Sequence, residues 1–251
     1  MKHLLGKIII KSDIKRYIKI NRNQLQILDA LFIDGGHTKK YIDKQKQLRY
    51  SEHSGNLDFN NNKLDRIIVS AQTNREDIDD IDILLPEDLN DSYTYKYFFH
   101  THPLTPTILD RVKNGILYDF PSIPDIFHFI DHYNMGTTLG SVVIAPEGYY
   151  IIYPNDFKLK KIDYDIDIEN EIINKLDDGL DDIQIKAINK YSDNFSEDFF
   201  YSNIIVDKTF LNMYNKLINK YLNNQLKIVL HNRIKNKLSN KWIVKSLNLL
   251  I

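Results

Sequence analysis

The chain has 251 residues, of which 43% are hydrophobic and 27% are charged, and its formal net charge is -1. This composition is that of an ordinary globular protein, and the balanced charge argues against nucleic acid as a partner. There is no cysteine, so disulfides are excluded and a transition-metal site would have to use histidine and carboxylate ligands.

The N-terminal third predicts strands around one helix. The apolar segment Leu4–Ile10 is too short and too charged for a signal peptide or a membrane span, which predicts an intracellular protein, cytoplasmic or nuclear, without membrane association. The β-branched runs within Gly6–Ile20 predict one or two short strands. Apolar residues at helical spacing predict a helix over Asn23–Ile33, which Gly35 and Gly36 would end.

A β-hairpin is predicted next, with the strands Arg49–Phe59 and Leu64–Ser70 on either side of three consecutive asparagines. Gly55 within the first strand indicates a bulge or the close approach of another group. A brief helix is expected at Pro86–Leu89, because proline suits the first helical position. Tyr95–Thr101 then predicts a buried strand.

The connection Pro103–Pro121 is long, which suggests function or mobility, and a short helix is expected within it around Ile108–Val112. Apolar side chains at helical spacing predict a further helix over Ser122–Tyr133. A second hairpin is predicted from Thr138–Ile144 and Tyr149–Tyr153, which flank a proline- and glycine-containing turn.

A change of pattern near residue 160 predicts a domain boundary. Residues 1–160 predict an α/β (α+β) domain of strands and helices, and residues 161–251 predict a helical C-terminal region. The basic amphipathic end of that region, Leu226–Leu238, could contact a partner protein or an anionic surface. The simpler interpretation, that it packs back on the first domain, is favoured.

The most informative motif is His-Thr-His-Pro at residues 100–103, at the end of the buried strand. Because alternate strand residues point to one face, His100 and His102 can offer both imidazoles to one ion. Asp125, in the first turn of the helix beginning at Ser122, is the third candidate ligand, and two histidines with one aspartate form an open catalytic zinc set. Each of these motifs is weak evidence when taken alone, because an H-x-H often arises by chance and Ser-x-x-Asp is also an ordinary capping box.

Taken together and in order, Glu52-His53-Ser54-Gly55-Asn56-Leu57, the motif at 100–103 and Ser122-Ile123-Pro124-Asp125 resemble the JAB/MPN domain of the JAMM metalloprotease family. That family has a glutamate on a strand ahead of a glycine, then H-[ST]-H-P closing a central strand, then S-x-x-D opening a helix. The resemblance covers Gly6–Tyr153 and implies a JAB/MPN-like mixed β-sheet flanked by helices. The chain departs from the family in the longer segment Leu104–Pro121, which puts substrate preference in doubt more than catalysis.

The resemblance implies an isopeptidase with one Zn²⁺ per chain, bound by His100, His102 and Asp125 with a fourth position open to water. Glu52 would be the general base, and the Ser122 hydroxyl would stabilise the developing oxyanion. The expected substrates are conjugates of ubiquitin or a ubiquitin-like protein.

Glu52 is not the only glutamate that could be the general base. Glu76 and Glu87 also precede the histidines, but Gly55 and Leu57 beside Glu52 match the family pattern and decide for it.

Two other classes of function are open. A non-catalytic MPN scaffold would usually have lost metal-binding residues, and their retention here argues against it. A metal-dependent phosphoesterase would need further ligands, for which His128, His132 and His231 are available. His128 and His132 lie one helical turn apart, but no H-E-x-x-H glutamate accompanies them, which favours ordinary packing.

Overall fold

The computed structural model describes residues 17–38, 40–42, 48–50, 52–61, 63–74, 96–102, 108–156, 158–191 and 194–250. The expected strand within residues 7–10, the brief helix at Pro86–Leu89 and the alternative bases Glu76 and Glu87 lie outside these ranges.

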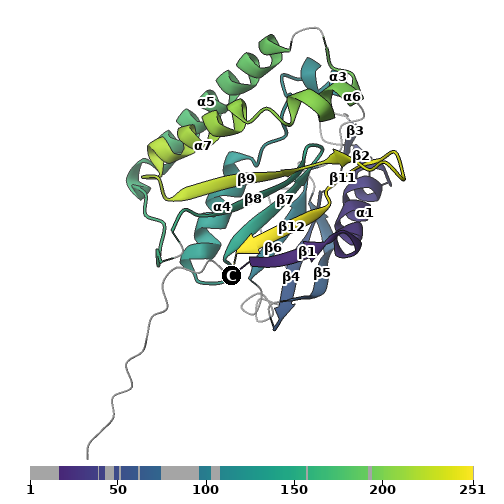
Figure 1. Ribbon diagram of the computed structural model, residues 1–251. Coiled ribbons are helices and arrows are strands. Elements are labelled where there is room, and N and C mark those ends of the chain that lie inside the picture. Colours follow the sequence, from purple (N-terminus) through teal and green to yellow (C-terminus); the bar gives the residue numbers. More distant parts are fainter. Residues whose placement is uncertain are drawn as a thin grey trace, which may run out of the picture.

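The centre of the fold is a six-stranded mixed sheet with the strand order β5-β4-β6-β7-β8-β9 (Figure 1). Its members are β4 (Glu52–Asn60), β5 (Lys63–Asn74), β6 (Tyr97–Thr101), β7 (Gly140–Ala145), β8 (Gly148–Pro154) and β9 (Leu226–Asn232). β6 and β7 are parallel, whereas the other neighbouring pairs are antiparallel. The sheet and its helices confirm the expected mixed α/β class, and both predicted hairpins are present.

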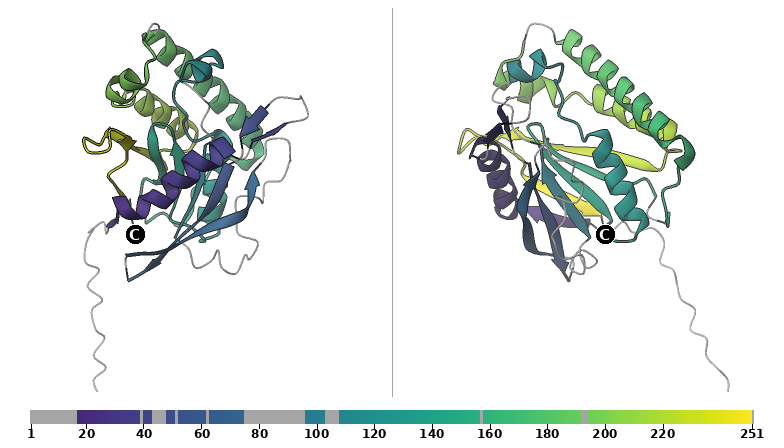
Figure 2. Two further views of the ribbon diagram at one scale, coloured as in Figure 1. Left: turned by 90° about the vertical axis from the view of Figure 1, so that its right-hand side faces the viewer. Right: turned by 180° about the vertical axis from the view of Figure 1, so that it is seen from behind.

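Two layers cover the two faces of this sheet (Figures 1 and 2). One face packs against α4 (Ile123–Asn134), α5 (Glu169–Lys190) and α7 (Thr209–Tyr221). The other packs against α1 (Arg22–Thr38) and a two-stranded sheet of β1 (Tyr17–Asn21) and β12 (Ser246–Leu250). The core therefore has two halves, separated by the sheet.

The remaining elements are short. They are β2 (Lys40–Ile42), β3 (Leu48–Tyr50), α3 (Ile108–Lys113), the 3-10 turn η2 (Ile166–Ile168), α6 (Glu197–Phe199), the π-helical turn η3 (Phe200–Ile204), β10 (Ile234–Lys235) and β11 (Trp242–Ile243). α3 confirms the helix expected inside the long connection before α4.

Helix α1 corrects one sequence expectation. The helix does not end at Gly35 and Gly36 but continues through both to Thr38. A glycine ends a helix where its backbone turns to the left-handed conformation, whereas Gly35 and Gly36 both lie within the helix. Glycine composition alone therefore misplaced the end of α1.

The expectation of a helical region after residue 160 is also corrected in part. Leu226–Leu238 is not helical, because β9 occupies Leu226–Asn232 and pairs with β8 in the central sheet. Leu226, Ile228 and Leu230 are buried while Lys227 is exposed, which is the two-residue period of a strand. The favoured interpretation, packing against the first domain, is confirmed, and the sequences on both sides of residue 160 share one sheet and one core.

Side chains of α7 hold the outer edge of β9. Asn215 accepts a hydrogen bond from the Ile228 amide (2.8 Å) and donates one to the Ile228 carbonyl (2.9 Å). Asn219, one helical turn later, makes the same pair of bonds to Leu226 at 3.1 and 2.8 Å. These two amides take the place of a neighbouring strand, and they fix α7 relative to the sheet.

Candidate metal centre

His100 on strand β6 and His102, the residue after its end, lie on the face of the sheet that α4 covers. Phe98 packs into the core beneath α4, and His100 and His102 follow it at alternate positions. The His102 amide donates to the carbonyl of Ile144 on β7 (2.9 Å), which continues the β6 to β7 pairing past Thr101. His100 and His102 are 2% and 7% exposed. The strand predicted from the sequence thus holds two imidazoles inside the protein.

Helix α4 supplies the carboxylate. Ser122 is its N-cap, and the hydroxyl oxygen of Ser122 accepts a hydrogen bond from the Asp125 amide (3.2 Å). In return, the Ser122 amide donates to Asp125 Oδ2 at 2.7 Å. The capping box considered as the ordinary explanation of Ser-x-x-Asp is therefore present, and the same bonds aim the Asp125 carboxylate at β6.

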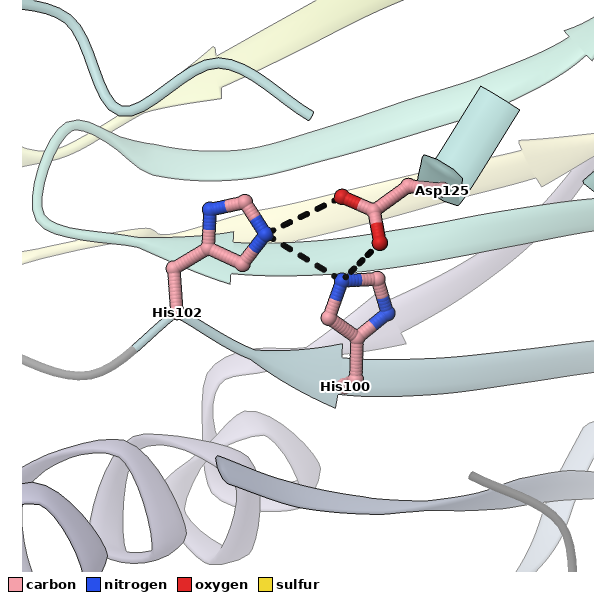
Figure 3. A group of neighbouring side chains, drawn as sticks. All are labelled: His100, His102 and Asp125. Carbon is pink, nitrogen blue, oxygen red and sulfur yellow. Dashed lines mark hydrogen bonds and ion pairs between the residues drawn. The ribbon is translucent and has the colours of Figure 1, made fainter. Parts of the chain in front are cut away.

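His100, His102 and Asp125 form a compact group that could hold a metal ion (Figure 3). The two Nε2 atoms are 3.3 Å apart, His100 Nε2 is 3.1 Å from Asp125 Oδ1, and His102 Nε2 is 3.1 Å from Asp125 Oδ2. In a tetrahedral site with bonds of about 2.0 Å, neighbouring ligand atoms are separated by about 3.3 Å. The spacing of the two nitrogens and the carboxylate oxygens therefore suits three ligands of one tetrahedral ion.

The charges in this group depend strongly on one another. Burial by itself would raise the pKa of Asp125, but His100 and His102 outweigh it and hold that pKa well below the usual range. Burial would likewise lower the pKa of His102, but Asp119 and Asp125 outweigh it and hold that pKa well above the usual value. The pocket therefore favours a negative carboxylate next to positive charge, which a proton or a metal ion can supply.

Asp119 is the neighbour that the sequence analysis missed. Its Oδ1 lies 3.2 Å from His102 Nδ1. A carboxylate only accepts, so Nδ1 of a neutral His102 carries the proton and Nε2 presents a lone pair toward Asp125 Oδ2. At 3.1 Å, these two atoms are bridged either by a proton on Nε2 or by a metal ion that both of them bind. A histidine held by a carboxylate on its outer nitrogen is the usual arrangement around zinc.

Glu52 begins β4 on the side of the sheet that carries the histidines. Ser54 pairs with His100 in the antiparallel β4 to β6 ladder, so Glu52, two residues earlier, lies across from His102. Burial raises the pKa of Glu52, with smaller opposing effects from His102 and His100. The structure therefore brings the predicted base to the same place as the triad.

Three other histidines considered as ligands do not join this group. The ring of His128 packs edge-on against Phe98, with 5.2 Å between centroids, and His132 Nδ1 lies 3.0 Å from Thr137 Oγ1. His231 lies on β9, opposite Tyr149 of β8. Within the part of the chain that the structure describes, the triad is the one group of three with metal-ligand spacing.

One further finding concerns membranes. Among the helices that the structure describes, none combines the length and the apolar character needed to span a bilayer.

Comparison with known proteins gives one relative. The chain is 35% identical over 241 residues to an uncharacterized protein of Acanthamoeba polyphaga mimivirus, and the match covers 93% of this chain. It spans only 65% of that relative's length. No protein-family model and no solved structure matches the chain.

Proposed function

We propose that this chain is a zinc-dependent isopeptidase that hydrolyses the bond between ubiquitin, or a ubiquitin-like protein, and its conjugate. The observation that carries the proposal is the spacing of the two histidine Nε2 atoms and the Asp125 carboxylate: 3.3 Å between the nitrogens and 3.1 Å from each nitrogen to one carboxylate oxygen. Two nitrogens and one carboxylate suit zinc better than magnesium or calcium, which prefer oxygen ligands. Three protein ligands leave one tetrahedral position for water or substrate.

Bound there, Zn²⁺ would supply Lewis acidity and make water a nucleophile near neutral pH. Glu52, across from His102, would take the proton of that water at its carboxylate and return it to the leaving amine. Its raised pKa moves it closer to neutral pH, which suits both transfers.

Ser122 would assist from the helix start. Its hydroxyl oxygen already accepts from the Asp125 amide, so its own O–H is available to donate to the oxyanion that develops on the cleaved carbonyl. The half-buried position of Ser122 at the end of α4 keeps that donor next to the triad.

The substrate class rests on the ordered resemblance to the JAB/MPN domain. Three separated motifs occur in the family's order: Glu52 lies across from His102 in the β4 to β6 register, the histidines and Asp125 form the triad, and Ser122 caps the helix that carries Asp125. Convergence of this kind supports amide hydrolysis over an accidental H-x-H.

The test is zinc analysis coupled to a cleavage assay. The purified chain is expected to hold about one zinc and to cleave ubiquitin chains or a ubiquitin-like fusion, while Glu52→Gln retains the metal and loses turnover. Glu171→Gln, an exposed glutamate on α5, is the matched control and should behave like the wild type. A metal-free, inactive wild type would contradict the proposal. Zinc without cleavage of any substrate would favour a scaffold, and more than one metal per chain would favour a phosphoesterase.

A further inference from the structure

Asp119 lies in a stretch of irregular backbone, residues 116–121, that joins α3 to the start of α4. We call this stretch the Asp119 segment. It belongs to the long connection in which the chain departs from the JAB/MPN pattern. What holds this segment decides where the Asp119 carboxylate lies.

One side chain beyond residue 160 binds the segment three times. The side-chain oxygen of Gln184, on α5, accepts hydrogen bonds from the amides of Leu117 (3.0 Å) and Tyr118 (3.1 Å). Its Nε2 donates to the Tyr118 carbonyl at 2.6 Å. Gln184 is 6% exposed, and a buried amide is costly unless it is paired in this way.

Two tyrosines add further bonds between the segment and the C-terminal region. The Tyr214 hydroxyl, on α7, donates to the Pro121 carbonyl at 2.6 Å. The Tyr118 hydroxyl donates to the carbonyl of Ile204, at the end of η3, at 2.7 Å. Phe120 stacks on the Tyr214 ring with 5.0 Å between centroids.

The central sheet also binds the Asp119 segment, through Glu147 in the tight turn between β7 and β8. Its Oε1 accepts from the Asp119 amide (2.9 Å) and from Arg111 Nη1 (3.3 Å). The Glu147 side chain is fully buried. Asp119 is thus fixed at its backbone by Glu147, next to the residues that Gln184 binds.

We propose that Asp119 is a positioning residue for His102 and that Gln184 sets its place, so that metal affinity depends on the region beyond residue 160. This inference rests on the proposed metal centre. The Asp119 carboxylate fixes the tautomer and the ring orientation of His102 through Nδ1. His100 Nδ1 is buried and has no hydrogen-bond partner among the described residues, which leaves His102 as the histidine that is oriented from outside.

The first experiment replaces Asp119, whose side chain is 22% exposed, by asparagine. Asp119→Asn keeps the shape and removes the charge, so folding should be retained. The zinc dissociation constant, measured by chelator competition, is expected to rise roughly 10- to 100-fold. The visible absorption spectrum of the Co²⁺ form is expected to change as well. Asp182→Asn, an exposed change two residues from Gln184 on α5, should leave both unchanged.

The second experiment tests the link to α5. Gln184→Met has a similar volume and removes all three bonds to the Asp119 segment, so zinc binding is expected to weaken. If Gln184 acts through Asp119, the double variant Asp119→Asn, Gln184→Met should lose less affinity than the sum of the two single losses. A purely structural role of Gln184 would instead give additive losses.

The outcomes separate this inference from the proposed function. A wild type that binds no zinc overturns both. Equal zinc dissociation constants for the wild type and Asp119→Asn overturn the role of Asp119 but leave the proposed metal centre intact. Gln184→Met with a lower melting temperature and an unchanged zinc dissociation constant overturns the role of the C-terminal region.

Discussion

The Ser122 amide donates a 2.7 Å hydrogen bond to Asp125 Oδ2, the same oxygen that lies 3.1 Å from His102 Nε2. One carboxylate oxygen therefore closes the first turn of α4 and faces the metal centre. Because the donor in this bond is the backbone of Ser122, the direction of the carboxylate does not need the serine side chain.

Ser122→Ala should consequently separate metal binding from catalysis. Zinc content should be unchanged, because the amide bond to Asp125 remains. Loss of the hydroxyl cap should lower the free energy of unfolding by about 1 kcal/mol. Loss of an oxyanion donor should lower kcat roughly 100- to 1,000-fold. Zinc analysis, urea unfolding and the cleavage assay measure the three effects, and a metal-free Ser122→Ala protein would contradict this assignment.

Metal should stabilise the fold, since the three ligands come from β6 and α4 and meet only in the folded chain. At free Zn²⁺ about 100-fold above the dissociation constant, the gain is about 2.7 kcal/mol. Thermal unfolding with zinc and with chelator measures it. His102→Gln should abolish the difference, and Mg²⁺ should not replace Zn²⁺ because it prefers oxygen ligands. An equal response of the wild type and His102→Gln would count against the centre.

Acid should destabilise the protein through His128. Burial, followed by the charges of His132 and His100, lowers the pKa of His128 from 6.5 to about 4. Between these two values the unfolded state binds the proton and the folded state does not, so the free energy of unfolding falls as pH falls from 6.5 toward 4. Between about pH 7 and pH 4.5, the free energy of unfolding should fall by about 2 kcal/mol less in His128→Asn than in the wild type. Urea unfolding of both proteins with chelator present tests this, and parallel pH curves would refute it.

Gly55→Ala should destabilise the hairpin that carries Glu52. A Cβ at this position would lie 1.9 Å from the Ile68 carbonyl oxygen and 2.9 Å from Phe99 Cζ. Since the first of these atoms is backbone, the β4 to β5 pairing has to shift, at a cost of at least about 2 kcal/mol. The control is Val69→Ala, at the cross-strand neighbour of Gly55. The Val69 side chain is exposed, so this change should lower the free energy of unfolding by less than about 1 kcal/mol. Similar unfolding midpoints for the two variants would be inconsistent with this packing.

The triad was predictable because each ligand obeys a local rule. The two-residue period of a strand places His100 and His102 on one face, and the capping box places Asp125 in the first turn of α4. The expectation that Gly55 marks a bulge or a close approach is also confirmed, by the register shift between His53 and Gly55 and by its contact with Ile68.

Asp119 and β9 were missed for the opposite reason. The position of Asp119 depends on Glu147, 28 positions along the chain, and its neighbour Tyr118 depends on Gln184, 66 positions away. No local pattern encodes bonds of that range. The β9 segment alternates apolar and polar residues, but its lysines and leucines also fit an amphipathic helix, so its composition alone did not decide between them.

Strand β1 has its partner only after residues 246–250 have been synthesised, because β12 is its antiparallel neighbour. Asp29 of α1 has Arg22 as a nearby partner, but its second ion pair forms with Arg233, which is 204 positions later. At ribosomal rates of about 5 to 20 residues per second, β1 stays without its partner strand for roughly 10 to 45 s. A nascent chain interrupted before β12 would carry His100, His102 and Asp125 but not a closed second half of the core, and it should be a target for chaperones and proteases.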